Sequence, residues 1–189
     1  MLIAFGLATP TVKADNCLLA VGNLVANCGF ETGTFTGWTQ SGNTGFTSVT
    51  PGAANTGNFG ASFGPVGTLG FISQNIVTLP GVTYNVTFHL RNLGSTPNEF
   101  RFLWGGNLIT TILNAPPSPY TEFSFSVLAT TVLTDLRFGF RQDPSFWNFD
   151  DVVVTPGGAP IPEPTTMILL ATGLVGAGIK ARRRRNNKL

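Results

Sequence analysis

The central part of this chain lacks lysine and carries little charge of either sign. Residues 15–161 contain four arginines against eight acidic residues, which gives this part a formal net charge of −4. The value of +2 for the whole chain therefore comes from its two ends. Without a basic patch in the body there is nothing to hold the phosphates of a nucleic acid, so we predict no nucleic-acid partner.

The residues that most often carry catalysis are also scarce. The chain has one histidine, His89, and two cysteines, so a nucleophile paired with a base cannot be assembled from a recognisable motif. Glu31 with Asp150 or Asp151 might meet the separation of a glycosidase carboxylate pair, but no other acid has a companion with motif character. We therefore predict that the protein is not an enzyme.

Helical periodicity is missing from the body as well, and alternation of apolar and polar residues takes its place. Alternation of this kind predicts strands with one buried and one solvated face. The clearest strands are predicted at residues 83–91, 100–104, 123–127, 135–141 and 149–154, with softer candidates at 18–25, 45–49, 60–63 and 70–78. Eight to ten short strands separated by Gly/Pro/Asn turns predict an all-β fold, an antiparallel jelly-roll β-sandwich over residues 15–154, followed by a linker at 155–161.

The C-terminal end has three parts in a fixed order. Pro162, Glu163 and Pro164 precede an uncharged run over residues 165–179, and Arg182, Arg183, Arg184 and Arg185 follow it. As a helix the run would be roughly 22 Å long, short for a bilayer but able to span with some thinning. The arginines indicate that this end stays in the cytoplasm. A plain C-terminal membrane anchor is the alternative to the more specific interpretation that follows.

These three parts closely resemble the PEP-CTERM sorting signal of Gram-negative bacteria that make exopolysaccharide. The resemblance implies that exosortase, a membrane-embedded enzyme, is a partner and that it reads Pro162, Glu163 and Pro164. It also implies export across the inner membrane, a C-terminal hydrophobic helix outside the domain that anchors the protein before processing, and a final place in the envelope, at the surface or outside the cell.

The first 14 residues fit the same route. An apolar stretch at 1–8 and small residues at Val12 and Ala14 resemble a signal peptide cleaved before Asp15. No basic residue precedes the stretch, so we expect part of the signal to lie upstream of the first residue given; the alternative is a buried first strand. Because export leads to a compartment that permits disulfides, we predict a Cys17–Cys28 bridge, with two free thiols as the alternative.

Two segments at opposite ends of the body carry a second resemblance. Asn27–Trp38 (NCGFETGTFTGW) and Phe146–Val152 (FWNFDDV) resemble the opening and closing motifs of galactose-binding-like β-sandwiches, which include many carbohydrate-binding modules. The resemblance implies a structural Ca²⁺ held by Glu31 and by Asp150 or Asp151, which period two would place on opposite faces. Ca²⁺ takes about six to eight hard oxygen ligands. The alternative is that these acids cap turns.

Binding of exopolysaccharide or another glycan is the function that this resemblance favours, and its site is only loosely indicated. Sugar sites combine exposed aromatic rings with amides and arginines. Trp38 and Trp104 are predicted to be core residues, so Trp147 is the tryptophan whose place in the core is least firmly predicted. The tentative ligand-binding residues are Trp147, His89, Arg91, Arg137 and Arg141. The alternatives are a plain solvated sheet face and a purely structural, adhesive protein of a biofilm or floc.

Overall fold

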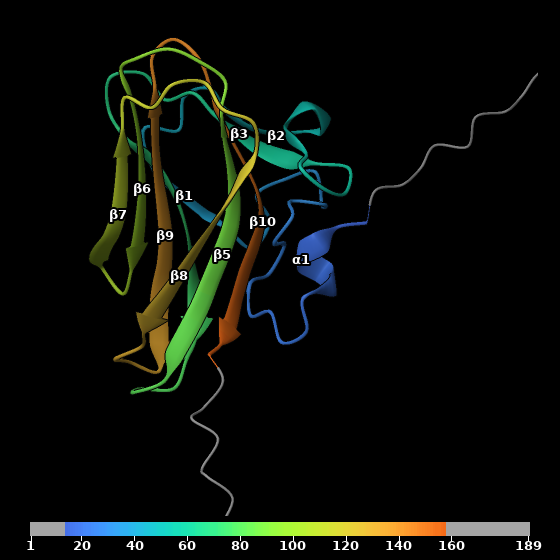
Figure 1. Cartoon of the computed structure of the whole chain (residues 1–189), viewed down its shortest axis with the longest axis vertical. Coiled ribbons are helices and arrows are strands. Elements are labelled where there is room, and N and C mark those ends of the chain that lie inside the picture. Colours follow the sequence, from blue (N-terminus) through green and yellow to red (C-terminus); the bar gives the residue numbers. More distant parts are fainter. Residues whose placement is uncertain (1–13, 158–189) are drawn as a thin grey trace, which may run out of the picture. The chain divides into compact units, whose positions relative to one another are not determined.

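The computed structural model describes residues 14–157, which fold into two stacked antiparallel sheets (Figure 1). Sheet A has the order β1-β4-β9-β6-β7 and sheet B the order β2-β3-β10-β5-β8. Sheet A contains β1 (Thr39–Gly42), β4 (Gly70–Val77), β9 (Leu133–Gln142), β6 (Asn98–Trp104) and β7 (Asn107–Leu113). Sheet B contains β2 (Thr47–Thr50), β3 (Gly60–Phe63), β10 (Trp147–Pro156), β5 (Thr83–Asn92) and β8 (Thr121–Leu128). The predicted antiparallel β-sandwich is confirmed.

Alternation along the strands decides which side chains enter the space between the sheets. In β5 every second residue from Tyr84 to Asn92 is buried, and β6 and β9 follow the same rule. Phenylalanine fills most of this space: the rings of Phe63 and Phe140 stack with centroids 3.8 Å apart, and Phe138 and Phe149 meet at 4.7 Å. Trp38 and Trp104 are buried in the same core, as predicted.

The N-terminal segment of the body differs from the prediction. Residues 18–25 were expected to form a soft strand, but α1 (Asn16–Leu19) is a short helix with Asp15 as its N-cap. The side chain of Asp15 accepts from the amides of Cys17 and Leu18, which favours a turn of helix over extended backbone. The segment that follows lies along β10, where Leu24 N donates to Val154 O over 2.9 Å. Cys17 and Cys28 are joined by the predicted disulfide, which closes this segment.

Two strands of sheet A, β1 and β7, were not predicted. All four residues of β1 are exposed, and β7 (NLITTIL) is an edge strand with exposed residues on both faces. Neither strand therefore shows the alternation of apolar and polar residues by which a strand with one buried face is predicted.

Several sequence predictions fall on residues outside the described range. They are the signal peptide over residues 1–14 apart from its last residue, the sorting motif Pro162, Glu163 and Pro164, the hydrophobic run 165–179 and the arginines 182–185. Within residues 14–157, no helix is long and apolar enough to cross a membrane.

Candidate functional site

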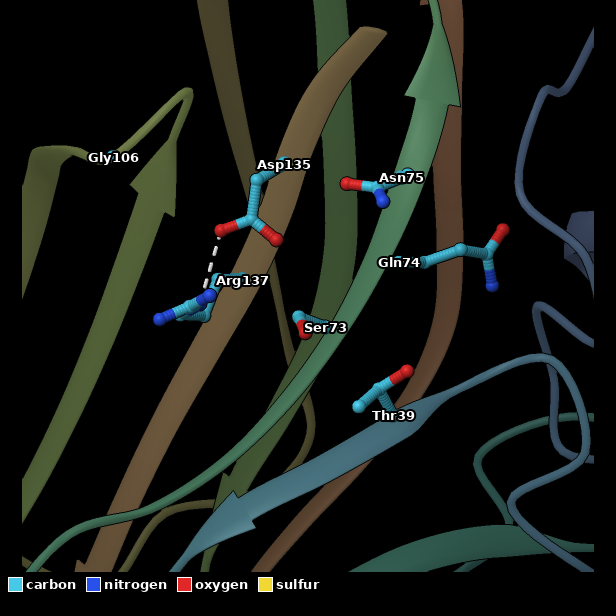
Figure 2. Close-up of a pocket in the computed structure, with 7 residues that line it drawn as sticks. All are labelled: Thr39, Ser73, Gln74, Asn75, Gly106, Asp135 and Arg137. Carbon is cyan, nitrogen blue, oxygen red and sulfur yellow. Dashed lines mark ion pairs between the residues drawn. The ribbon is translucent and has the colours of Figure 1, made fainter.

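The outer face of sheet A carries a shallow hollow of about 420 Å³ over β1, β4 and β9 (Figure 2). The strand register places its polar side chains in rows: Thr39 lies opposite Ser73, Ser73 opposite Arg137, and Asn75 opposite Asp135. Gln74 borders the hollow but points away from it, and its amide binds the backbone of Ala26 and Gly37 instead. The hollow therefore presents hydroxyl, amide, carboxylate and guanidinium groups on a rigid sheet.

Each arginine of this face forms an ion pair with an acid two residues away, on the same strand or, for Asp143, directly after its end. Arg137 Nε lies 3.0 Å from Asp135 Oδ2, and Arg141 Nη2 lies 2.8 Å from Asp143 Oδ2. Arg101 pairs in the same way with Glu99 on β6. Each pair joins residues two apart, which alternation places on one side of the strand. The face therefore carries strong hydrogen-bonding groups with no excess of positive charge.

An aromatic ring, which the sequence analysis did not single out, lies in the next row of the same face. Phe71 of β4 is half-buried, faces outward, and stands opposite Ser41 and Gly139. Gly139 leaves room for it: a Cβ placed on that glycine would lie 2.6 Å from Cε1 of Phe71. Arg101 is the cross-strand neighbour of Gly139 on the other side. The ring thus lies over the sheet backbone, between the serine of β1 and the arginine of β6.

The tentative ligand-binding residues do not form one face. Arg137 and Arg141 belong to sheet A, whereas His89 and Arg91 project outward from β5 in sheet B, on the opposite side of the sandwich. Trp147 is 2% exposed, and its Nε1 donates to the carbonyl of Arg141 over 3.0 Å. The idea of a single polar groove with Trp147 as an exposed platform is therefore wrong, because alternation gives the side of a strand but not the sheet to which it belongs.

The two end motifs do meet, around the loop between η1 (Pro51–Ala53) and β3. Asp150 Oδ2 accepts from the amides of Asn55 (2.7 Å) and Thr56 (3.2 Å). Asp151 accepts from the side chains of the same two residues. Glu31 Oε1 accepts from the amides of Asn58 (2.8 Å) and Phe59 (2.9 Å). All three predicted acids therefore hold one loop, and they hold it through N–H and O–H donors.

Asp150 and Asp151 were expected to point to opposite faces, and this is not what the structure shows. The register between β10 and β5 shifts between Asp150 and Val153, and Asp151 has a φ of 54°. This bulge breaks the period of two, so both carboxylates are buried and turn toward the same loop. His89 of β5 stands beside them, with Nδ1 3.6 Å from Asp151 Oδ2 and Nε2 3.7 Å from Glu122 Oε2.

Negative charge is in excess at this end of the fold. Burial, together with the charge of Asp151, raises the pKa of Asp150 to about 8. Burial also raises the pKa of Asp15, and Asp151 and Glu31 add to the effect. Asp15 Oδ2 is buried without a hydrogen-bond partner, packed against Gly29 where a Cβ would lie 2.4 Å away. An unpaired carboxylate oxygen that feels the charges of two further acids, Asp151 and Glu31, is an arrangement that a hard cation relieves.

The predicted ligands Glu31, Asp150 and Asp151 do not bring their ligand atoms together in one cluster. Within residues 14–157, the one group of three or more His, Cys, Asp or Glu side chains whose ligand atoms converge within 4.8 Å is Asp15 with Cys17 and Cys28. The two sulfurs of that group form the disulfide and are not available to a metal. The donor set at Asp15, Glu31, Asp150 and Asp151 fits Ca²⁺ by its chemistry, since every donor is a hard oxygen.

Comparisons with known proteins match the two parts of the chain separately, the C-terminal end by a sequence motif and the body by its fold. The PEP-CTERM protein-sorting motif matches residues 160–185, which confirms the predicted resemblance of the C-terminal end to this sorting signal. This motif implies export and a sorting signal that is anchored in the membrane. No curated protein sequence matches the chain.

Several solved structures share the fold of the body, and carbohydrate-binding modules are among them. The module TmCBM61, solved with β-1,4-galactotriose, has a TM-score of 0.55 and 21% identity, over 71% of this chain and 99% of the module. The CBM22-1 xylan-binding domain of Paenibacillus barcinonensis Xyn10C has a TM-score of 0.52 and 16% identity, over 69% and 92%. The enzymatically active domain of bacteriophage CBA120 tailspike protein 4 also matches, with a TM-score of 0.51 and 19% identity, over 71% of this chain but 21% of that one. The fold of the body is thus that of the carbohydrate-binding β-sandwiches.

Proposed function

We propose that this is an exported, exosortase-processed protein of the cell envelope or extracellular matrix that binds a polysaccharide without cleaving it. The observation that carries the proposal is the outer face of sheet A, where Phe71 lies beside a hollow lined by paired charges and amides. The structural neighbours support it, since one was solved with a galactose trisaccharide and another is named for xylan.

The chemistry of this face suits a sugar polymer. An aromatic ring offers its face to the C–H groups of a pyranose, and the flanking side chains supply donors and acceptors to its hydroxyls. Because Arg137 and Arg101 each have an acidic partner, the face has no net attraction for a polyanion. The hollow lies open across three strands, a shape that admits the middle of an extended chain. We therefore propose a neutral or weakly charged polysaccharide, such as the exopolysaccharide of the producing cell.

The C-terminal end supplies the route. In this proposal the run 165–179 holds the precursor in the inner membrane with Arg182, Arg183, Arg184 and Arg185 on the cytoplasmic side. Exosortase then processes the chain near Pro162, Glu163 and Pro164. The sandwich, which comes before this motif, is thereby delivered to the outer side.

Affinity electrophoresis of the full chain through gels that contain the producer's polysaccharide, or a panel of soluble glycans, tests the binding. Phe71→Ala should weaken binding about tenfold, since an aromatic contact is worth about 0.5–1.5 kcal/mol beyond the area that it buries. Gly139→Ala should weaken it as well while keeping the ring, because the new Cβ displaces Phe71.

Arg91→Ala, on the outer face of sheet B, is the matched control and should leave binding unchanged. Retarded migration that neither Phe71→Ala nor Gly139→Ala reduces would place the ligand elsewhere. A complete lack of retardation across the panel would favour the alternative, a structural matrix protein with no sugar ligand.

We propose in addition that the acidic end binds one Ca²⁺ that stabilises the fold. Glu31, Asp150 and Asp151 are the ligands predicted from the end motifs, and Asp15 is added because its Oδ2 is buried without a partner. The ion would supply the positive charge that four neighbouring carboxylates lack. Such a site is structural, because it ties the N-terminal segment, the 53–59 loop and β10 together.

A further inference from the structure

One end of the sandwich exposes a group of large apolar side chains that the glycan face and the acidic end do not use. They lie at the end of β4, at the start of β9 and in the two loops beside these strand ends. Between 51% and 74% of each residue is exposed to solvent: Val77, Leu79, Val132 and Leu133. We call this set the apolar end.

The two loops of the apolar end are joined into one surface. Val77 and Leu133 stand directly opposite each other in the β4–β9 register. Thr78 N donates to Val132 O over 3.0 Å, and Gly81 N donates to Ala129 O over 2.8 Å. These bonds hold the two loops side by side, so the four exposed apolar residues lie near one another on bonded backbone.

The two loop segments of this patch carry no charge, and Asp135 of β9 lies at its border. The two segments that form it, residues 76–83 (IVTLPGVT) and 127–134 (VLATTVLT), contain no Asp, Glu, Lys or Arg. Apolar side chains with threonine hydroxyls between them can enter the boundary between lipid headgroups and acyl chains, and the point where the chain leaves the sandwich favours this occupant.

The chain leaves the sandwich beside this patch. β10 ends at Pro156 opposite Tyr84, and Gly157 N donates to Thr83 O over 2.7 Å. Figure 1 shows the end of β10 at the same end of the sandwich as the β4–β5 and β8–β9 connections. Residues 158–164 then separate Gly157 from the hydrophobic run that begins at Thr165. Seven residues reach at most about 25 Å, so the anchored precursor cannot carry this end far from the membrane.

We propose that the apolar end docks on the surface of the lipid bilayer while the chain is anchored by its C-terminal signal. The docking would hold the segment with Pro162, Glu163 and Pro164 at the membrane surface, where a membrane-embedded enzyme reads it. This inference rests on the anchoring that is part of the proposed function, and it is independent of the sugar ligand.

Quenching of tryptophan by brominated phosphatidylcholine tests the docking, with the full chain reconstituted in liposomes of that lipid. A tryptophan introduced as Val132→Trp should lose fluorescence to the brominated lipid beyond the small loss of the wild-type chain, whose tryptophans are buried. Val66→Trp is the matched control. Val66 lies next to Pro65, whose carbonyl binds the amide of Gln142, at the far end of β9 from Leu133 and about 30 Å away. It should show no added quenching.

Leu79→Glu placed in the Val132→Trp chain should remove the added quenching, because a charge is costly at the acyl boundary. Quenching that persists in that variant, or that is equal at positions 66 and 132, would overturn the proposal. A further measurement uses liposomes that hold, on average, less than one copy of the chain. Quenching that disappears under this condition would show that a second copy of the chain covers the patch, and would also overturn the proposal. A chain that does not float with the liposomes contradicts the anchoring, whereas one that floats without quenching refutes the docking alone.

Discussion

Asp150 makes the stability of this fold depend on pH in an unusual direction. In the unfolded chain its carboxyl ionises near the ordinary value of 3.8, whereas burial and Asp151 raise its pKa in the folded state to about 8. Between these values the folded state binds more protons than the unfolded state. The free energy of unfolding therefore falls as the pH rises from about 4 to about 8, and levels off above that range.

The size of the effect follows from the same two values. A pKa raised by about four pH units, at about 1.4 kcal/mol each, corresponds to a loss on the order of 5 kcal/mol between pH 4 and pH 8. Total stabilities of domains are about 5–15 kcal/mol, so the loss is easily measured. Asp15, whose pKa is also raised, changes stability in the same direction.

Urea unfolding of the chain in excess chelator, followed at a series of pH values, measures this slope. Asp150→Asn should remove most of the dependence of stability on pH. The variant should also be less stable at every pH, because an amide accepts less well than a carboxylate from the backbone amides of Asn55, Thr56 and Asp151. Glu122→Gln, an exposed acid on β8, is the control and should keep the slope. A stability that rises with pH over this range, or a slope that Asp150→Asn leaves intact, would refute the reasoning.

Three further outcomes are expected. Millimolar Ca²⁺ should raise the melting temperature, more at pH 8 than at pH 5 because the metal competes with protons, and Glu31→Ala should abolish the rise; identical melting curves in Ca²⁺ and in chelator would contradict the site. The unreduced, denatured chain should contain no alkylatable thiol, and Cys17→Ser with Cys28→Ser should lower stability by about 2–3 kcal/mol in urea unfolding. Mass spectrometry of the mature protein from its native host should find a C-terminus without Arg182–Arg185, and an intact arginine cluster would rule out processing.

The sequence alone predicted most of the strands, because a half-buried strand shows alternating apolar and polar residues. β5 and β6 follow it over their whole length, and β9 departs from it only at the buried Gly139. The method failed where the burial is irregular: β7 is exposed on both faces, and α1 is a single turn held by the cap at Asp15. β7 depends on its position at the sheet edge, and α1 depends on local hydrogen bonds. The pattern of apolar residues in the sequence gives no information on either.

The candidate sites show a second limit. The end motifs pointed to Glu31, Asp150 and Asp151, and the structure does bring these acids to one loop. The loop residues that hold them, Asn55 and Asn58, lie in a stretch without any motif. Phe71 is similar, since its role depends on a glycine 68 positions later that stands opposite it only through the β4–β9 register.

The division of the polar residues between two faces follows from the topology. β8, β9 and β10 are consecutive in the chain, but β9 belongs to sheet A and its two neighbours to sheet B. An outward residue on β9 therefore lies on the opposite side of the molecule from an outward residue on β5 or β8. This separation has a functional consequence: the proposed glycan face around Phe71 and Arg137 shares no side chain with the acidic end around Asp150. Ca²⁺ should accordingly act on sugar binding only through the stability of the fold, so that well below the melting temperature the affinity for the polysaccharide is expected to be the same with and without the ion.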